Sequence, residues 1–379
     1  MGDALKHALF GVALATTLAA SAWLAPMPPE PRFAAREYHP APATLPEPLF
    51  ERHPIDPPPG TLQVHSGTLV EVADGGLLAA WFGGSREGAA DVAIQGARWD
   101  PRGGWGDPFV ILDRQDLERR LGRTLRKLGN PVLWRHPDGR IWLWVVTSGL
   151  GGWSTSSLVL CISQDQGRTW GPPRPLVTSP FLNISTLARG RPLDSADGGV
   201  LLPVYHELAG KFGELLRLDA QGHILAKSRI SAGRAAIQPS LVASGPDQAR
   251  AFLRRTGAAP AQVLSSNTQD GGHSWSPLAA TTLPNPDAAV AALGTPAGHY
   301  LLVYNGAPDQ RGRLDLARSL DGDQWRHLWS LEQGDAPDDE FSYPYLIRSQ
   351  AGDYQLIYTW QRRRMVHIRF NDAWLEQRP

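Results

Sequence analysis

Residues 131–145, PVLWRHPDGRIWLWV, consist of two short apolar segments separated by a turn at Asp138-Gly139. Asp-Gly supplies the positive φ angles that a tight hairpin turn requires, and the flanking segments have the length of β-strands. This stretch therefore predicts a β-hairpin. The arrangement occurs six times along the chain, with turns at Asp74-Gly75, Asp138-Gly139, Asp197-Gly198, Pro246-Asp247, Ala297-Gly298 and Gly352-Asp353.

The spacing of these hairpins predicts the fold. Successive turns are roughly 50 to 65 residues apart, which leaves room for a four-stranded sheet in each interval. A single hairpin cannot bury both of its faces, so such sheets must pack against one another around an axis. No segment has a sustained helical period, which argues against α/β architectures. We therefore predict an all-β fold, a six-bladed β-propeller over residues 60–379.

The N-terminal region has the composition of a targeting segment. An apolar run covers residues 8–25 and contains the small-residue cleavage pattern Ala20-Ser21-Ala22. We expect residues 1–25 to be a signal peptide, with the mature chain beginning near Trp23, or an uncleaved signal anchor. Residues 26–59 are rich in proline and predict a linker or wrap. The protein is thus predicted to be exported, either periplasmic or secreted, or held at the inner membrane by its N-terminal helix.

Charge and cysteine content exclude several classes of partner. Lys+Arg and Asp+Glu number 37 each, so no overall positive charge favours nucleic acid, and an acidic ligand must be bound by a local cluster. The single cysteine, Cys161, permits no disulfide within the chain and no paired-cysteine metal site. It lies in an apolar run, which indicates a buried structural thiol. No metal or cofactor motif is present, and we expect a monomer without a cofactor.

A second repeated motif lies between the hairpins. Residues 163–170, SQDQGRTW, fit the pattern S-x-D-x-G-x-T-W, and residues 268–275, TQDGGHSW, fit it with Thr and Ser exchanged. Residues 319–325 are a shortened copy and residues 98–105 a degenerate one. In such a motif the Ser and Asp side chains bond turn backbone, Gly adopts a left-handed conformation and Trp packs between sheets. From Thr61 to Phe370 the chain thus resembles the bacterial sialidases with Asp-box (BNR) repeats.

This resemblance implies a set of catalytic residues. The family uses arginines that bind a carboxylate, a Tyr nucleophile with a Glu partner, and an Asp acid/base. Tyr343, nine residues before Gly352, matches the nucleophile position. Gln238 stands in the position of the Glu and cannot act as a base. The segment after the first return strand contains the available acid/base equivalents, Glu87 and Asp91, together with Arg86.

The arginine positions match only in part. Arg254 or Arg255 ends the fourth return strand, and Arg311 or Arg313 follows the fifth. Guanidinium groups bind carboxylates through two parallel hydrogen bonds, so these residues are candidates for substrate binding. His65, followed by Ser66-Gly67, replaces the family's first arginine.

Further residues are expected to reach the same face of the propeller because they lie at equivalent strand ends. Trp153 could stack on a sugar ring, and His206 is a candidate for proton transfer near neutral pH. The other expected substrate-binding residues are Asn130, Tyr205 and Trp360.

Three functions are consistent with these residues. The leading hypothesis is a sialidase-like glycoside hydrolase that removes a terminal acidic sugar from a glycan. The second is a uronate lyase or related glycosidase in which His206 and a Tyr transfer protons; His65 and Gln238, which depart from the family pattern, favour it. The third is a glycan-binding propeller without catalytic activity, in which Trp153, Trp360 and the arginines hold the ligand.

Overall fold

The computed structural model describes residues 7, 11–14, 16, 32–34, 46–149, 151–179, 183–230, 233, 235–257 and 261–378. The chain divides into two compact units, residues 1–30 and 31–379. In the first unit residues 11–14 are helical, and most of the predicted signal segment lies outside the described residues. No helix within the described part of the chain is long and apolar enough to span a membrane.

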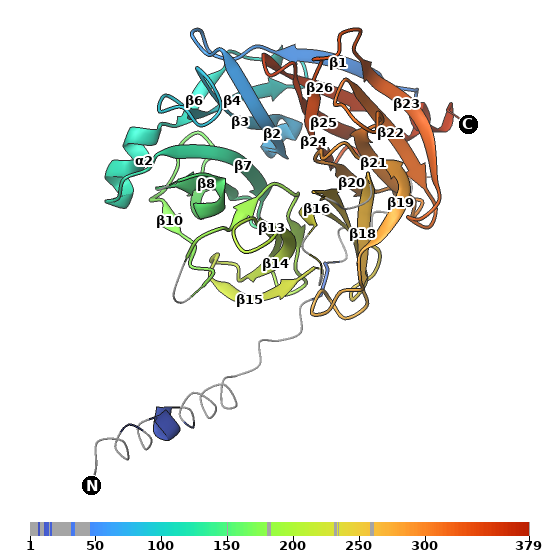
Figure 1. Cartoon of the computed structure of the whole chain (residues 1–379). Helices are drawn as coiled ribbons and strands as arrows, with labels where there is room; N and C mark the ends of the chain where they lie inside the picture. The colour runs from blue at the N-terminus through green and yellow to red at the C-terminus, as the bar shows by residue number, and fades with distance from the viewer. Residues whose placement is uncertain are drawn as a thin grey trace. The chain divides into compact units, whose positions relative to one another are not determined.

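The second unit is a six-bladed propeller built from six antiparallel sheets (Figure 1). The innermost strands are β2 (Gln63–Glu71), β7 (Lys127–Arg135), β11 (Leu187–Ala188) with β12 (Leu193–Asp194), β16 (Ala236–Ala243), β20 (Ala291–Gly294) and β24 (Phe341–Arg348). Each pairs with a return strand: β3 (Leu77–Gly84), β8 (Ile141–Ser148), β13 (Val200–His206), β17 (Ala249–Arg255), β21 (Tyr300–Asn305) and β25 (Tyr354–Trp360). All six predicted turns connect these pairs, so the predicted fold class is confirmed.

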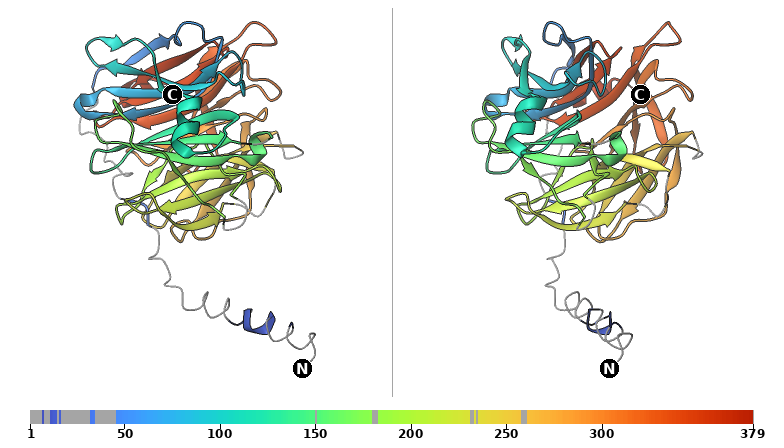
Figure 2. Two further views of the ribbon diagram at one scale, coloured as in Figure 1. Left: turned by 90° about the vertical axis from the view of Figure 1, so that its left-hand side faces the viewer. Right: turned by 60° about the vertical axis from the view of Figure 1, so that its left-hand side comes forward.

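The outer strands complete each blade. They are β4 (Ala93–Asp100), β5 (Gly104–Trp105) and β6 (Phe109–Leu112); β9 (Ser157–Ser163) and β10 (Arg174–Pro175); β14 (Phe212–Leu218) and β15 (Ile224–Arg229); β18 (Gln262–Thr268) and β19 (Ala279–Pro284); β22 (Arg313–Ser319) and β23 (Trp325–Gln333); and β26 (Arg364–Phe370) with β1 (Phe50–Ile55). Seen from the side, the sheets stack one behind another around the axis (Figure 2).

The last blade is closed by the N-terminal strand of the propeller. β1 pairs antiparallel with β26, from Phe50 opposite Phe370 to Ile55 opposite Met365. Upstream of it, Phe33 is only 1% exposed, and its N–H donates a hydrogen bond of 2.7 Å to Pro246 O. The segment predicted as a linker or wrap, residues 26–59, therefore includes parts of the propeller itself, since β1 forms the outer strand of the last blade.

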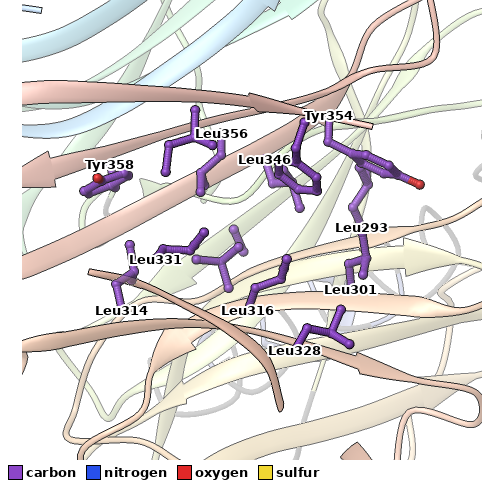
Figure 3. Close-up of a cluster of buried hydrophobic side chains, with 14 of the residues drawn as sticks. Leu293, Leu301, Leu314, Leu316, Leu328, Leu331, Leu346, Tyr354, Leu356 and Tyr358 are labelled. Carbon is purple, nitrogen blue, oxygen red and sulfur yellow. The ribbon is translucent and has the colours of Figure 1, made fainter. Parts of the chain in front are cut away.

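Apolar side chains fill the space between neighbouring blades. Figure 3 shows one such cluster, in which Leu314 and Leu316 of β22 pack with Leu346 and Leu356 of the last blade. All four side chains are at most 1% exposed. Burying a leucine contributes roughly 1.5–3 kcal/mol, so each interface between blades is a substantial core. This packing holds the inner strands in fixed positions around the axis.

Two short helices lie outside the strand pattern. Helix α2 (Arg114–Leu121) connects the first blade to the second and was not predicted. Asp113 caps its N-terminus by accepting hydrogen bonds from two backbone N–H groups, and Gly122, with φ of 63°, ends it. The helix has only eight residues, too few to establish a period in the sequence. Helix α3 (Asp372–Glu376) follows β26.

The Asp-box motifs form the local bonds that their sequence predicts. Ser163 Oγ accepts a hydrogen bond of 2.7 Å from the Gly167 N–H, and Asp165 accepts bonds from the N–H and hydroxyl of Thr169. These bonds hold the pKa of Asp165 well below its ordinary value. The motif follows β9, an outer-side strand, and its role is structural. Cys161 is fully buried in the same strand, and burial raises the pKa of its thiol to about 12.

Candidate functional site

In each blade one residue near the start of the innermost strand, or just before it, has a left-handed backbone conformation, and we call this residue the strand head. These residues are Ser66, Asn130, Ser185, Gln238, Asp287 and Tyr343, with φ between 32° and 63°. At Ser66, Asn130, Gln238 and Tyr343 the pairing register also shifts, as at a β-bulge. A bulge redirects the side chain of its residue, and positive φ in residues other than glycine is a strained conformation that is concentrated at functional sites. The six strand heads therefore form a repeated structural position that presents side chains at the axis.

Side chains from different blades meet at this position. Arg254 Nη1 donates hydrogen bonds to Tyr343 Oη at 3.3 Å and to Gln238 Oε1 at 3.2 Å. Tyr205 Oη accepts bonds from Gln238 Nε2 at 3.3 Å and from Asn130 Nδ2 at 3.1 Å. We call these five residues the axial cluster. They come from the second, third, fourth and sixth blades, which can meet only near the axis.

Two further residues surround the ring of Tyr343. The imidazole of His65 lies 4.2 Å from it, measured between ring centroids, and the guanidinium carbon of Arg189 lies 5.4 Å from the ring centroid. Arg189 also donates to the backbone oxygens of Tyr343 and Pro344 at 2.6 and 3.0 Å. Burial lowers the pKa of Arg189 to about 10 and holds the pKa of His65 well below its ordinary value. His65 is therefore neutral at neutral pH.

Arginine and carboxylate side chains alternate around the axial cluster. Arg254 Nε donates to Asp287 at 2.6 Å, and Arg311 donates to the backbone oxygen of Asp287 at 2.6 Å and to Glu340 at 3.3 Å. Arg362 bonds Glu340 at 2.7 Å. Burial opposes ionisation of Glu340, but the bonds from Arg362 and Ser342 outweigh it and lower its pKa to about 2. Most of the arginine charge near the site is thus already paired within the protein.

Glu207 lies next to the cluster and differs from these carboxylates. It follows β13, two residues after Tyr205, and its N–H donates to Ser185 Oγ at 2.8 Å. Burial raises the pKa of its carboxyl. The positive charges of Lys211 and Arg254 lower this pKa, whereas the negative charge of Asp287 raises it, and the net shift is upward. Glu207 thus differs from Glu340, whose pKa is lowered.

The structure decides between the paired arginine candidates. Arg254 belongs to the axial cluster, whereas Arg255 donates to the backbone oxygens of Asn285 and Gly257. Arg311 bonds to the backbone oxygen of Asp287 at the head of the fifth blade, whereas Arg313 bonds Asp315 within β22. Arg254 and Arg311 are therefore the two that reach the site.

Several other predicted residues lie away from the axial cluster. His206 stacks on Phe212 with ring centroids 4.8 Å apart, and its Nε2 accepts a bond from the Ala209 N–H. Trp153 packs on the core with Lys127 over its ring, and Trp360 packs beside Phe341. Side chains alternate between the two sides of a strand, so His206 points to the side opposite Tyr205. This explains why His206 is not part of the axial cluster.

The loop after the first return strand contributes unequally. Glu87 accepts a bond of 2.9 Å from Arg362 and so joins the charged network. Arg86 lines a small recess with His65, Glu87 and Arg362. Asp91 is exposed, and the N–H and hydroxyl of Ser85 hold its carboxylate at 2.8 and 2.9 Å and lower its pKa.

Five residues of this region were not among the predicted site residues: Arg189, Glu207, Asp287, Glu340 and Arg362. A usable signal exists for the strand heads, because Ser66, Asn130 and Gln238 lie nine residues before the second residue of their turn, and Tyr343 lies nine residues before the first residue of its turn, Gly352. Asp287 breaks this offset, since its blade has a longer segment between head and turn. Its place at the axis is visible only in the structure.

A separate cavity of about 450 Å³ lies at the other end of the inner strands. Residues near the hairpin turns line it, including Glu71, Arg135, Arg191 and Thr295. It contains none of the axial cluster, and the chemistry of the strand heads makes them the better candidate site. Among the described residues no group of three or more His, Cys, Asp or Glu side chains is arranged to hold a metal ion.

Comparison with known proteins identifies the family. Residues 75–356 match the model of the BNR repeat-like domain, and the chain belongs to this family. No curated protein sequence gives a significant match.

Solved structures show the same fold at low identity. They include a protein of unknown function from Dyadobacter fermentans (TM-score 0.67, 14% identity, covering 85% of this chain and 98% of that one). The intramolecular trans-sialidase of Ruminococcus gnavus matches with a TM-score of 0.65 at 15% identity, covering 83% and 96%. An α-L-arabinanase of Penicillium chrysogenum matches with a TM-score of 0.60 at 16% identity, covering 88% and 100%. The fold is therefore that of sialidases and of an arabinanase, which confirms the predicted resemblance.

Proposed function

We propose that the protein is a glycoside hydrolase that removes a terminal acidic sugar from a glycan at the axial cluster. The observation that carries this proposal is the contact of Arg254 Nη1 with the phenol oxygen of Tyr343. A guanidinium stabilises negative charge on the oxygen that it contacts, as a Tyr nucleophile requires. A tyrosine nucleophile is a known exception among glycosidases, which otherwise use two carboxylates.

Arg254 also provides the contact for an acidic sugar. Its Nε and Nη1 are bonded within the protein, whereas its Nη2 has no hydrogen-bond partner among the described residues. A substrate carboxylate can therefore accept a charge-assisted hydrogen bond there. Arg254 is paired with Asp287 through its Nε, but this leaves Nη2 facing no protein acceptor among the described residues, so we expect Arg254 to contribute to the preference for acidic sugars.

The test uses matched glycosides that differ only in the acidic group of the terminal sugar. Arg254→Ala should raise KM for the acidic substrate roughly 10- to 100-fold, the value of a hydrogen bond to a charged group, and change KM for the neutral one much less. Arg255→Ala is the matched control, because this adjacent guanidinium donates to the backbone oxygens of Asn285 and Gly257 and is not a member of the axial cluster. Equal effects on both substrates would refute a role in carboxylate binding.

The same assay separates the rival functions. A hydrolase releases free sugar, a lyase releases an unsaturated product that absorbs in the ultraviolet, and a binding protein releases neither. The lyase hypothesis requires His206 to transfer a proton at the site. The imidazole of His206 instead packs on Phe212, away from the axial cluster, which disfavours this hypothesis. Gln238 favours the binding hypothesis, because it places no carboxylate beside Tyr343. This hypothesis would be supported if the protein binds a glycan but does not cleave it.

We also propose that the protein is exported. The apolar run of residues 8–25 and its cleavage pattern support this proposal. N-terminal sequencing of the native protein should find a start near Trp23, or an intact chain in the membrane fraction. An intact Met1 on cytosolic protein would refute export.

A further inference from the structure

The carboxyl groups around the axial cluster differ in whether they are free to exchange a proton. Glu340 is bonded to Arg362, Arg311 and Ser342, and Glu87 is paired with Arg362 at 2.9 Å. Asp287 is paired with Arg254 at 2.6 Å. All three carboxyls are therefore held in ion pairs with arginines, and for Glu340 these contacts also lower the pKa.

The acid/base that the family resemblance suggests is also poorly placed. Asp91 lies on the surface, and Ser85 supplies two hydrogen-bond donors to its carboxylate. Donors to the ionised form disfavour protonation, and no contact joins Asp91 to the axial cluster within the described residues. The first blade therefore does not supply the proton donor in this conformation.

Glu207 is held beside the cluster by its backbone. The N–H groups of Glu207 and Leu208 both donate to Ser185 Oγ at 2.8 Å, and Ser185 is the strained head of the third blade. β13 ends at His206, and the carboxyl of Glu207 lies within electrostatic reach of Tyr205 and Arg254, both members of the axial cluster. Tyr205 bonds both Gln238 and Asn130, which places Glu207 next to the axial cluster.

The carboxyl of Glu207 is free of the pairing that occupies its neighbours. It makes no ion pair and no side-chain hydrogen bond with the described residues, although it is partly buried. Burial disfavours its ionised form and raises its pKa, whereas burial lowers the pKa of His206 next to it. Glu207 thus combines an unpaired carboxyl with a position within electrostatic reach of Tyr205 and Arg254, the arrangement that a general acid needs.

We infer that Glu207 is the general acid/base of the glycoside hydrolysis, an assignment that rests on the proposed function. In the first step Tyr343 loses its phenol proton to solvent and its oxygen bonds the anomeric carbon, while the bond from that carbon to the leaving oxygen breaks. The proton of Glu207 passes to the leaving oxygen. In the second step water bonds the anomeric carbon, the bond to Tyr343 breaks to restore the phenolate, and a proton of the water returns to Glu207.

The kinetic test compares leaving groups. Glu207→Gln should lower kcat/KM roughly 10²–10⁴-fold for an alkyl glycoside, which needs protonation to depart, and far less for a nitrophenyl glycoside, which does not. Glu376→Gln, on helix α3 far from the axis, is the matched control. Asp91→Asn is the competing variant. If Asp91→Asn shows the leaving-group dependence and Glu207→Gln does not, the inference is overturned.

A second measurement needs no turnover. In protein with ¹³C-labelled glutamate carboxyls, one resonance should titrate above the range of exposed glutamates and be absent from Glu207→Gln. Titration of Glu207 at or below that range would overturn the inference even if the enzyme is active. Release of no sugar from any glycan by the wild-type protein would instead refute the proposed function, and with it the role of Glu207.

Discussion

Replacing Tyr343 with phenylalanine removes one oxygen atom from the axial cluster. The aromatic ring stays, together with its contacts to His65 at 4.2 Å and to the guanidinium of Arg189 at 5.4 Å. Phenylalanine is as strained as tyrosine at a φ of 54°, so the backbone cost of the position does not change. The substitution therefore isolates the phenol.

The structure sets the expected magnitudes. The phenol oxygen accepts one hydrogen bond, from Arg254, at a long distance of 3.3 Å. A bond of this kind contributes about 0.5 kcal/mol to the free energy of unfolding, the low end of the usual range. Loss of the nucleophile or proton donor should in contrast lower kcat at least 100-fold, roughly the smallest effect expected of such a group.

Sugar release and urea unfolding should be measured on the same preparations, with Tyr345→Phe as control. Tyr345 lies on the same strand and is fully buried, and its hydroxyl donates to Leu133 O at 3.1 Å. We expect this control to lose at least as much stability as Tyr343→Phe while keeping kcat. Unchanged kcat in Tyr343→Phe, or equal losses of kcat in both variants, would refute the placement of the phenol in the reaction.

Four further predictions concern the mechanism and the framework. Gln238→Glu should keep or raise the rate of hydrolysis, because it restores a carboxylate beside Tyr343; loss of turnover would favour the lyase. Burial opposes ionisation of Asp270, but the hydrogen bonds in its Asp-box outweigh this and lower its pKa to about 2 from 3.8, so its stabilisation is present above pH 3.8 and lost as the pH falls to 2. Asp270→Asn should accordingly unfold in urea with a smaller difference in midpoint between pH 5 and pH 2 than wild type. Leu316→Ala should cost about 2–5 kcal/mol in urea unfolding, because the side chain is fully buried between two blades. Phe33→Ala should cost about 3–5 kcal/mol, and a cost near zero would show that the segment does not anchor the propeller.

The local pattern was sufficient to predict the fold because a hairpin is specified by neighbouring residues. Turn residues such as Asp138-Gly139 permit the required positive φ angles, and the apolar strands on either side determine the pairing. The bonds of Ser163 and Asp165 in the Asp-box are equally local, since they join residues within one turn. The closing strand β1 was not predicted, because its partner β26 lies more than 300 residues away in the sequence.

Part of the site could be predicted for the same reason. Tyr343 and Gln238 were found by their offset from the turn, which is constant where the inner strand runs without interruption from head to turn. Asn130 has the same offset in the second blade, and His65 directly precedes the residue with this offset in the first blade. Arg254 and Arg255 could not be separated, because adjacent residues at a strand end point to different sides, and only the packed blade decides which side faces the axis.

The sequence by itself thus determined the number of blades, the structural Asp-boxes and the strand heads Asn130, Gln238 and Tyr343. The tertiary structure decided how charge is distributed there. Asp287 neutralises Arg254 across two blades, Arg362 pairs with Glu87 and Glu340, and Glu207 keeps an unpaired carboxyl. Such pairings depend on the closure of six sheets around one axis, which brings together residues that are distant along the chain, and no local pattern of residues encodes the distance between them.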